Sequence, residues 1–97
     1  MDNRLKVTRT QTGLRIEKRI LKVLKALAEY FDITLGDLIE GIVLHAFDGK
    51  QPFDENSLKK IAEIKNVYDL DLDHTHSHKL IEKNSGDGPD GADEAPA

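Results

Sequence analysis

The 97-residue sequence contains no cysteine. This absence excludes disulfide bonds and thiolate-based sites, and it is typical of a reducing, intracellular setting. No apolar run approaches the ~18 residues that a membrane-spanning helix requires, and the first residues, MDNRLKVTR, lack the apolar core of a signal peptide. We therefore expect a cytoplasmic protein that makes no membrane contact.

The motifs around which many enzymes are built are also missing. The sequence has no phosphate-binding glycine loop and no serine-centred nucleophile elbow, and its acid pairs fall on the surfaces of expected helices. We expect neither catalysis nor a cofactor.

Large apolar residues are absent from residues 83–97, KNSGDGPDGADEAPA. Such a segment cannot bury enough surface to offset the entropy of ordering it, so we predict a disordered acidic tail. Residues 1–82 remain for folding, a length at which one core is marginal without disulfides, metals or oligomerisation. Because disulfides are excluded, we expect the chain to oligomerise.

The formal net charge of −4 conceals a split along the chain. Residues 1–31 carry eight Lys and Arg against three acids, whereas residues 32–97 carry six against fifteen. This asymmetry predicts a basic surface at the N-terminal end. The alternative is that Lys18, Arg19, Lys22 and Lys25 form an ordinary solvated helix face.

Apolar residues recur at helical spacing in three segments. The first helix is expected over 17–30, and a second opens at Thr34 and ends near Asp48 and Gly49. A third is expected over 55–68 behind an Asp54 N-cap, followed by a short helix over 77–82. Because the first two helices are joined by so few residues, they must cross or lie antiparallel around a common core.

Residues 10–16, TQTGLRI, alternate polar and apolar side chains and predict a short strand before the first helix. A lone strand leaves its backbone donors and acceptors unmet. We therefore expect two copies to pair these strands antiparallel, with four helices interlocking beneath them.

The order of basic strand, helix, tight link and helix over 10–47 resembles the Arc/MetJ/CopG-like ribbon-helix-helix family of repressors. The resemblance implies a mostly α, homodimeric protein that binds double-stranded DNA and could assemble further on it. The expected organisation is a basic arm over 1–9, a ribbon-helix-helix domain over 10–49, a helical extension over 50–82 and a tail over 83–97.

The resemblance also implies which residues meet DNA. Two-stranded ribbons enter the major groove, and the outward positions here are Gln11, Gly13 and Arg15. Arg15 could bridge guanine O6 and N7, and Gln11 could do the same at adenine. Gly13 departs from the family pattern because it offers no side chain, and it would instead let the backbone approach the groove.

Phosphate contacts are implied at the start of the second helix, where Thr34, Leu35 and Gly36 occupy the family's clamp position. An ordinary N-cap at Thr34 is the alternative. The predicted strand does not extend back over residues 1–9, because Leu5 and Val7 would face the opposite side from Leu14 and Ile16. Three basic residues therefore lie before the ribbon: Arg4, Lys6 and Arg9. They form either an arm that touches phosphates or an ordinary disordered terminus.

The expected dimer core consists of apolar side chains from the ribbon and both helices, which couples folding to dimerisation. Its members are Leu14, Ile16, Leu24, Leu27, Phe31, Leu38, Ile39 and Ile42.

Two further readings stay open. The stretch HTHSH contains three alternating histidines, His74, His76 and His78. In an extended segment they would lie on one side and could bind Zn or Ni. The alternative is that these histidines are simply solvated. The same fold could also serve as a protein-interaction module, binding a second protein through the ribbon or through residues 50–97, as an antitoxin binds its toxin.

Overall fold

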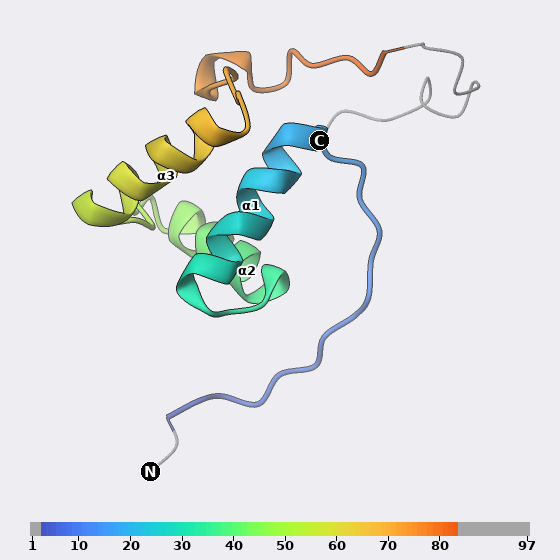
Figure 1. The fold of residues 1–97 in the computed structure, drawn as a ribbon. Coiled ribbons are helices and arrows are strands. Elements are labelled where there is room, and N and C mark those ends of the chain that lie inside the picture. The colour runs from blue at the N-terminus through green and yellow to red at the C-terminus, as the bar shows by residue number, and fades with distance from the viewer. Residues whose placement is uncertain (1–2, 84–97) are drawn as a thin grey trace.

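The computed structural model describes residues 3–83, and these residues are mostly helical, as predicted (Figure 1). The elements are α1 (Lys18–Phe31), α2 (Leu35–Phe47), α3 (Glu55–Val67) and a single 3-10 turn, η1 (His74–His76). An elongated segment over 3–17 precedes α1 and contains no regular element. None of the helices described is long and apolar enough to cross a membrane.

Both ends of α1 are fixed by local hydrogen bonds. The Glu17 carboxylate accepts the backbone N–H groups of Arg19 and Ile20, each at 2.9 Å, and so satisfies donors that a helix start leaves unpaired. At the other end Asp32 adopts a left-handed conformation with φ 58°, and the Ile33 N–H donates to the Ala28 carbonyl at 3.0 Å. The chain therefore turns sharply into α2.

Side-chain caps also start α2 and α3, at the residues that the sequence predicts. Thr34 Oγ1 accepts the N–H of Asp37 at 3.1 Å, and Asp54 Oδ1 accepts the N–H of Ser57 at 2.8 Å. Helix α2 ends just before Gly49, whose φ of 68° suits a residue without a Cβ. The predicted bounds of all three helices are thus confirmed to within about a residue or two.

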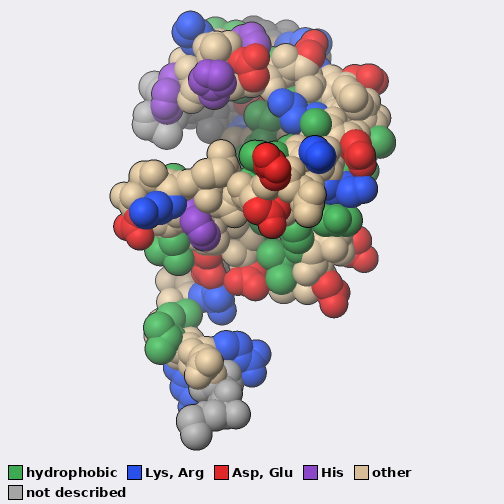
Figure 2. All heavy atoms as spheres, turned by 90° about the vertical axis from the view of Figure 1, so that its left-hand side faces the viewer, with side chains coloured by type: hydrophobic (Ala, Val, Ile, Leu, Met, Phe, Trp, Pro, Cys, Tyr) green, Lys and Arg blue, Asp and Glu red, His purple; other side chains and the backbone are tan. Residues whose placement is uncertain are grey.

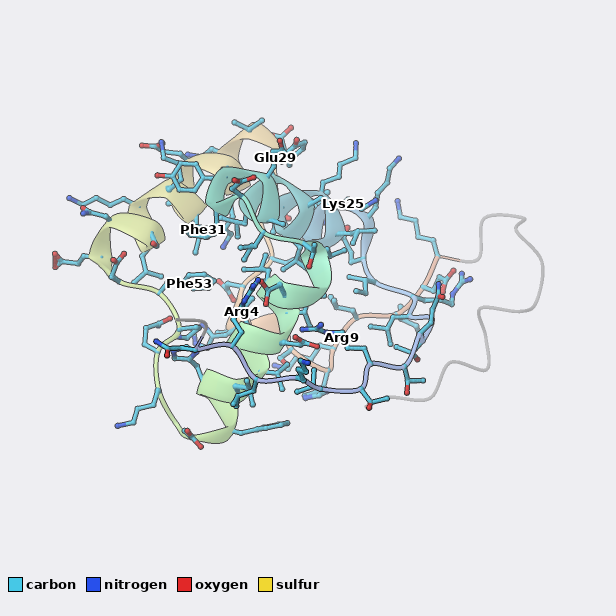
Figure 3. All side chains as sticks on the ribbon, turned by 90° about the horizontal axis from the view of Figure 1, so that it is seen from below. Arg4, Arg9, Lys25, Glu29, Phe31 and Phe53 are labelled. Carbon is cyan, nitrogen blue, oxygen red and sulfur yellow. The ribbon has the colours of Figure 1, made fainter. Side chains whose placement is uncertain are left out.

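The core lies where α1 packs against both other helices. Its buried residues are Val23, Leu27, Ala28 and Leu38. The partly buried residues packed around them are Leu24, Phe31, Ile42, Phe53, Ile61, Ile64, Tyr68 and Leu70. Phe31 and Phe53 stack with ring centroids 6.2 Å apart (Figure 3). Residues 53–70 therefore share one core with the first two helices.

The short helix predicted over 77–82 is wrong. The Asp73 carboxylate caps a turn that begins earlier, accepting the N–H of Thr75 at 2.9 Å, while the Asp73 N–H bonds to His76 Nδ1 at 3.0 Å. The turn ends at Ser77, and His78 takes a φ of 64°, which a continuing right-handed helix does not allow. The predicted disordered tail lies, except for Lys83, outside the described residues.

Candidate nucleic-acid interface

The N-terminal arm carries the basic residues predicted to touch phosphates. Figure 2 shows Lys and Arg side chains gathered on this arm, below a helical body whose face carries many Asp and Glu side chains. Lys6 is exposed, and Arg4 lies nearer than Arg9 to the N-terminal end of the same segment (Figure 3). The charge asymmetry read from the sequence is therefore also an asymmetry in space.

Arg9 is the point where the arm meets α2. Its Nε and Nη2 donate to the two carboxylate oxygens of Glu40 at 2.9 and 2.8 Å. These hydrogen bonds are the main cause that lowers the pKa of Glu40 and raises the pKa of Arg9, and the charge of Asp37 also acts on Arg9. The structure thus brings one predicted phosphate-binding residue to the first turns of α2.

The start of α2 offers two backbone donors to an anion. The first N–H groups of a helix have no intrahelical partner, and here Thr34 satisfies that of Asp37. The N–H groups of Leu35 and Gly36 precede it, and a Cβ built at Gly36 would meet nothing within 4 Å. This end of α2 is open to a phosphate, and Thr34 acts as an N-cap whether or not one binds.

The residues predicted to read bases, Gln11, Gly13 and Arg15, are all exposed on the elongated segment. Leu14, predicted to point inward, is 71% exposed in the single chain. Pairing between two copies is what the sequence predicts for this segment, and that pairing stays a prediction. The single chain does not bring these residues to one face with the start of α2.

Sequence reasoning missed the acids that meet the arginines near the start of α1. Arg15 Nε donates to Glu82 Oε1 at 3.1 Å, and Arg15 Nη2 donates to Glu82 Oε2. Arg19 Nη1 donates to Asp71 Oδ1 at 2.9 Å and to the Asp69 carbonyl at 3.0 Å. Alternating Leu and Asp in the stretch DLDLD was a usable signal, because Leu70 and Leu72 turn inward and leave Asp71 outward.

The predicted dimer-core residues differ in how far the single chain buries them. Leu27 and Leu38 are buried within the chain, and Leu24, Phe31 and Ile42 pack against them. Ile16 and Ile39 are half-buried, while Leu14 is exposed. The C-terminal part of α2 also exposes apolar side chains: Val43 is 37%, Leu44 63% and Phe47 78% exposed.

A hollow of about 440 Å³ lies between α2 and the segment that leads into α3, lined by apolar rings and by the His45 side chain. His45 Nδ1 lies 2.7 Å from the Gly41 carbonyl, so one ring nitrogen is engaged within α2. The hollow is continuous with the core residues Phe31, Ile42 and Phe53.

The three histidines considered as metal ligands do not form an extended, one-sided row. His74 and His76 lie in η1, and His78 follows at positive φ. His76 Nδ1 is already engaged with the Asp73 N–H. Across residues 3–83, no group of three or more His, Cys, Asp or Glu side chains is arranged to hold a metal ion.

Comparison with known proteins adds no relative. No family model matched the chain, and no curated protein or solved structure was similar enough to match it.

Proposed function

We propose that the protein is a cytoplasmic, homodimeric DNA-binding protein of the ribbon-helix-helix kind, acting as a transcriptional repressor or autoregulator. In this proposal residues 10–16 of two copies pair antiparallel and enter the major groove. The observation that carries it is the apolar surface that a single chain leaves in water on α2 and on the elongated segment before α1.

A second copy of the same chain fits that surface. Ile39, Val43 and Phe47 follow one another at four-residue spacing, so they share one side of α2. Among the described elements α2 contacts only α1 extensively, so these apolar side chains are not covered by α3. A two-fold dimer lets each copy cover the other's α2 and satisfy the other's ribbon backbone.

Charge supports DNA as the ligand. The arm and α1 are the basic part of the chain, and the open start of α2 offers N–H groups and a positive dipole end. Arg9 approaches the same turns of α2 from the arm. Backbone donors at the start of α2 and the nearby Arg9 suit phosphate contacts, which position a protein on a duplex, while Arg15 and Gln11 would read bases.

The test is a fluorescence-anisotropy titration with a randomised duplex pool at two salt concentrations, with sedimentation to fix the oligomer. We expect dimers whose affinity for DNA falls steeply as salt rises. Arg15→Ala should weaken binding to a duplex selected from the pool by about 1–3 kcal/mol, because a bidentate base contact is lost.

Lys59→Ala is the matched control, since it removes one exposed positive charge from α3, away from the arm. It should bind the selected duplex almost as the parent chain does. Equal affinities for the parent, Arg15→Ala and Lys59→Ala would remove Arg15 from the reading set. Dimers that bind no DNA at low salt would contradict the proposed function.

One observation favours a second function, a protein-interaction module on the same fold. Two arginines predicted to meet DNA, Arg9 and Arg15, are paired with acids of the chain itself. If neutralising Glu40 and Glu82 together still yields dimers that bind no DNA, the exposed apolar side of α2 and residues 50–97 become the surface on which to look for a protein partner.

A further inference from the structure

We propose that the segment following α3 is an autoinhibitory clamp, in which Glu82 occupies Arg15, a residue that DNA would otherwise engage, while Asp71 ties the segment to Arg19. This inference rests on the proposed function and adds a regulation of the same interface. Residues 69–82 form the clamp segment, and its acids reach Arg15 and Arg19 across the longest sequence separations of any hydrogen bonds described here.

The clamp segment is guided to this place by the way α3 ends. The Leu70 N–H donates to the Lys65 carbonyl at 2.9 Å, and Asp69 adopts φ 54°, so the chain reverses at the end of α3. It then passes over the N-terminal end of α1 (Figure 1). Since α3 itself packs on α1, this return path is fixed by the core.

Leu70 anchors the start of the clamp segment, because it packs against the buried cluster. Farther along, Leu72 and Leu80 line a hollow of about 320 Å³ whose other side includes Ile20 of α1. Alternate residues of an extended chain point to opposite sides, so anchoring Leu70 and Leu72 turns Asp71 away from the core. Asp71 then meets Arg19 Nη1 at 2.9 Å.

At Arg15 the clamp takes the hydrogen-bonding geometry that DNA would use. Two guanidinium donors, Nε and Nη2, face the two oxygens of Glu82. A guanine edge and a phosphate each present a pair of acceptors to the same kind of fork. One N–H cannot serve both partners fully, so a DNA acceptor that uses the Nε and Nη2 donors of Arg15 must displace Glu82.

The ion pair between Arg15 and Glu82 is weak enough to be broken when DNA binds. Both side chains are partly exposed, and exposed ion pairs contribute little to folding stability because water and salt screen them. Removing the Glu82 charge should therefore leave the fold intact and act on DNA binding alone.

The experiment compares Glu82→Gln with Glu63→Gln in the full chain, using the same randomised duplex pool. Both substitutions remove one negative charge, and Glu63 pairs with Lys60 on α3, away from Arg15. We expect Glu82→Gln to bind DNA about two- to fivefold more tightly than Glu63→Gln at low salt, the range set by the strength of one exposed ion pair. In an Arg15→Ala background this gain should vanish.

Each other outcome is decisive. If the parent binds DNA but Glu82→Gln matches Glu63→Gln, the clamp is overturned and the DNA-binding function stands. A gain that persists without Arg15, or that sedimentation traces to a tighter dimer, also overturns it. If the parent and both variants bind no DNA, the proposed function fails and the clamp with it.

Discussion

Helices α1 and α2 are nearly equal in length, yet they use their apolar residues differently. α1 carries a charged face and buries Val23, Leu27 and Ala28 between its two neighbours. α2 is more apolar, but among its described residues Leu38 alone is buried. The comparison shows that α1 buries its apolar residues within one chain, whereas α2 leaves apolar side chains exposed, with Leu44 63% and Phe47 78% exposed.

The largest effect on stability should come from a substitution at Leu27, a residue of α1 that is only 3% exposed. Leu27→Ala should lower the free energy of unfolding by about 2–5 kcal/mol, because it removes buried methyl groups and leaves a cavity. Urea denaturation followed by circular dichroism measures the change. Leu5→Ala, the same change at an 87% exposed position, should leave stability within about 0.5 kcal/mol.

The α2 side of the comparison is tested at Val43. Val43→Asp puts a charge on the surface that we assign to the dimer, and it should weaken dimerisation by about 2 kcal/mol or more. Sedimentation over a range of protein concentrations measures this. Val67→Asp makes the same change at the exposed end of α3 and should sediment as the parent does. If the two variants sediment alike, Val43 does not lie in a dimer interface.

A smaller effect is expected at the cap that starts α2. Thr34→Ala removes the acceptor for the Asp37 N–H and should cost about 1 kcal/mol in unfolding free energy. Thr34→Ser keeps a hydroxyl and should restore most of it. Thermal unfolding of the three chains measures the difference. If alanine and serine destabilise equally, the hydroxyl does not act as a cap.

The smallest expected effect is on how the stability of the fold depends on pH, through the Asp54 carboxyl group. The N–H of Ser57 holds the pKa of Asp54 below its ordinary value, so the folded state binds a proton less readily at Asp54 than the unfolded state does. This stabilisation is complete above the ordinary Asp pKa of about 4 and is lost as pH falls below it. Asp54→Asn should flatten the loss of stability between pH 5 and pH 3, and parallel curves for the two chains would contradict the assignment.

Sequence patterns were sufficient for the helices because helix formation is local. Spacing of apolar residues and caps at Thr34 and Asp54 act over one or two turns, and the structure keeps them. After α3 the sequence pattern predicted a helix over 77–82, and this prediction was wrong. An N-cap at Asp73 starts a turn earlier in the chain, and the left-handed conformation of His78 ends it after one turn.

The sequence was sufficient to predict the basic residues of the candidate site but not the acids that pair with them. Arg9, Arg15 and the start of α2 could be named from charge and spacing, but their partners could not. The pairs Arg9–Glu40 and Arg15–Glu82 join residues 31 and 67 positions apart, and no periodicity marks an exposed ion pair. Which acid meets which arginine depends on the path that the core imposes on the arm and on the return segment.

The pairing of Arg15 with Glu82 gives this arginine a counterion that belongs to the chain itself. A dissolved anion leaves when the solution is diluted, but a tethered carboxylate keeps the same effective concentration at any protein concentration. Binding of DNA at Arg15 would leave the Glu82 carboxylate without its partner, and cations drawn to Glu82 would partly offset the cations released from the DNA. The dependence of affinity on salt would accordingly be shallower than the number of arginines at the interface suggests.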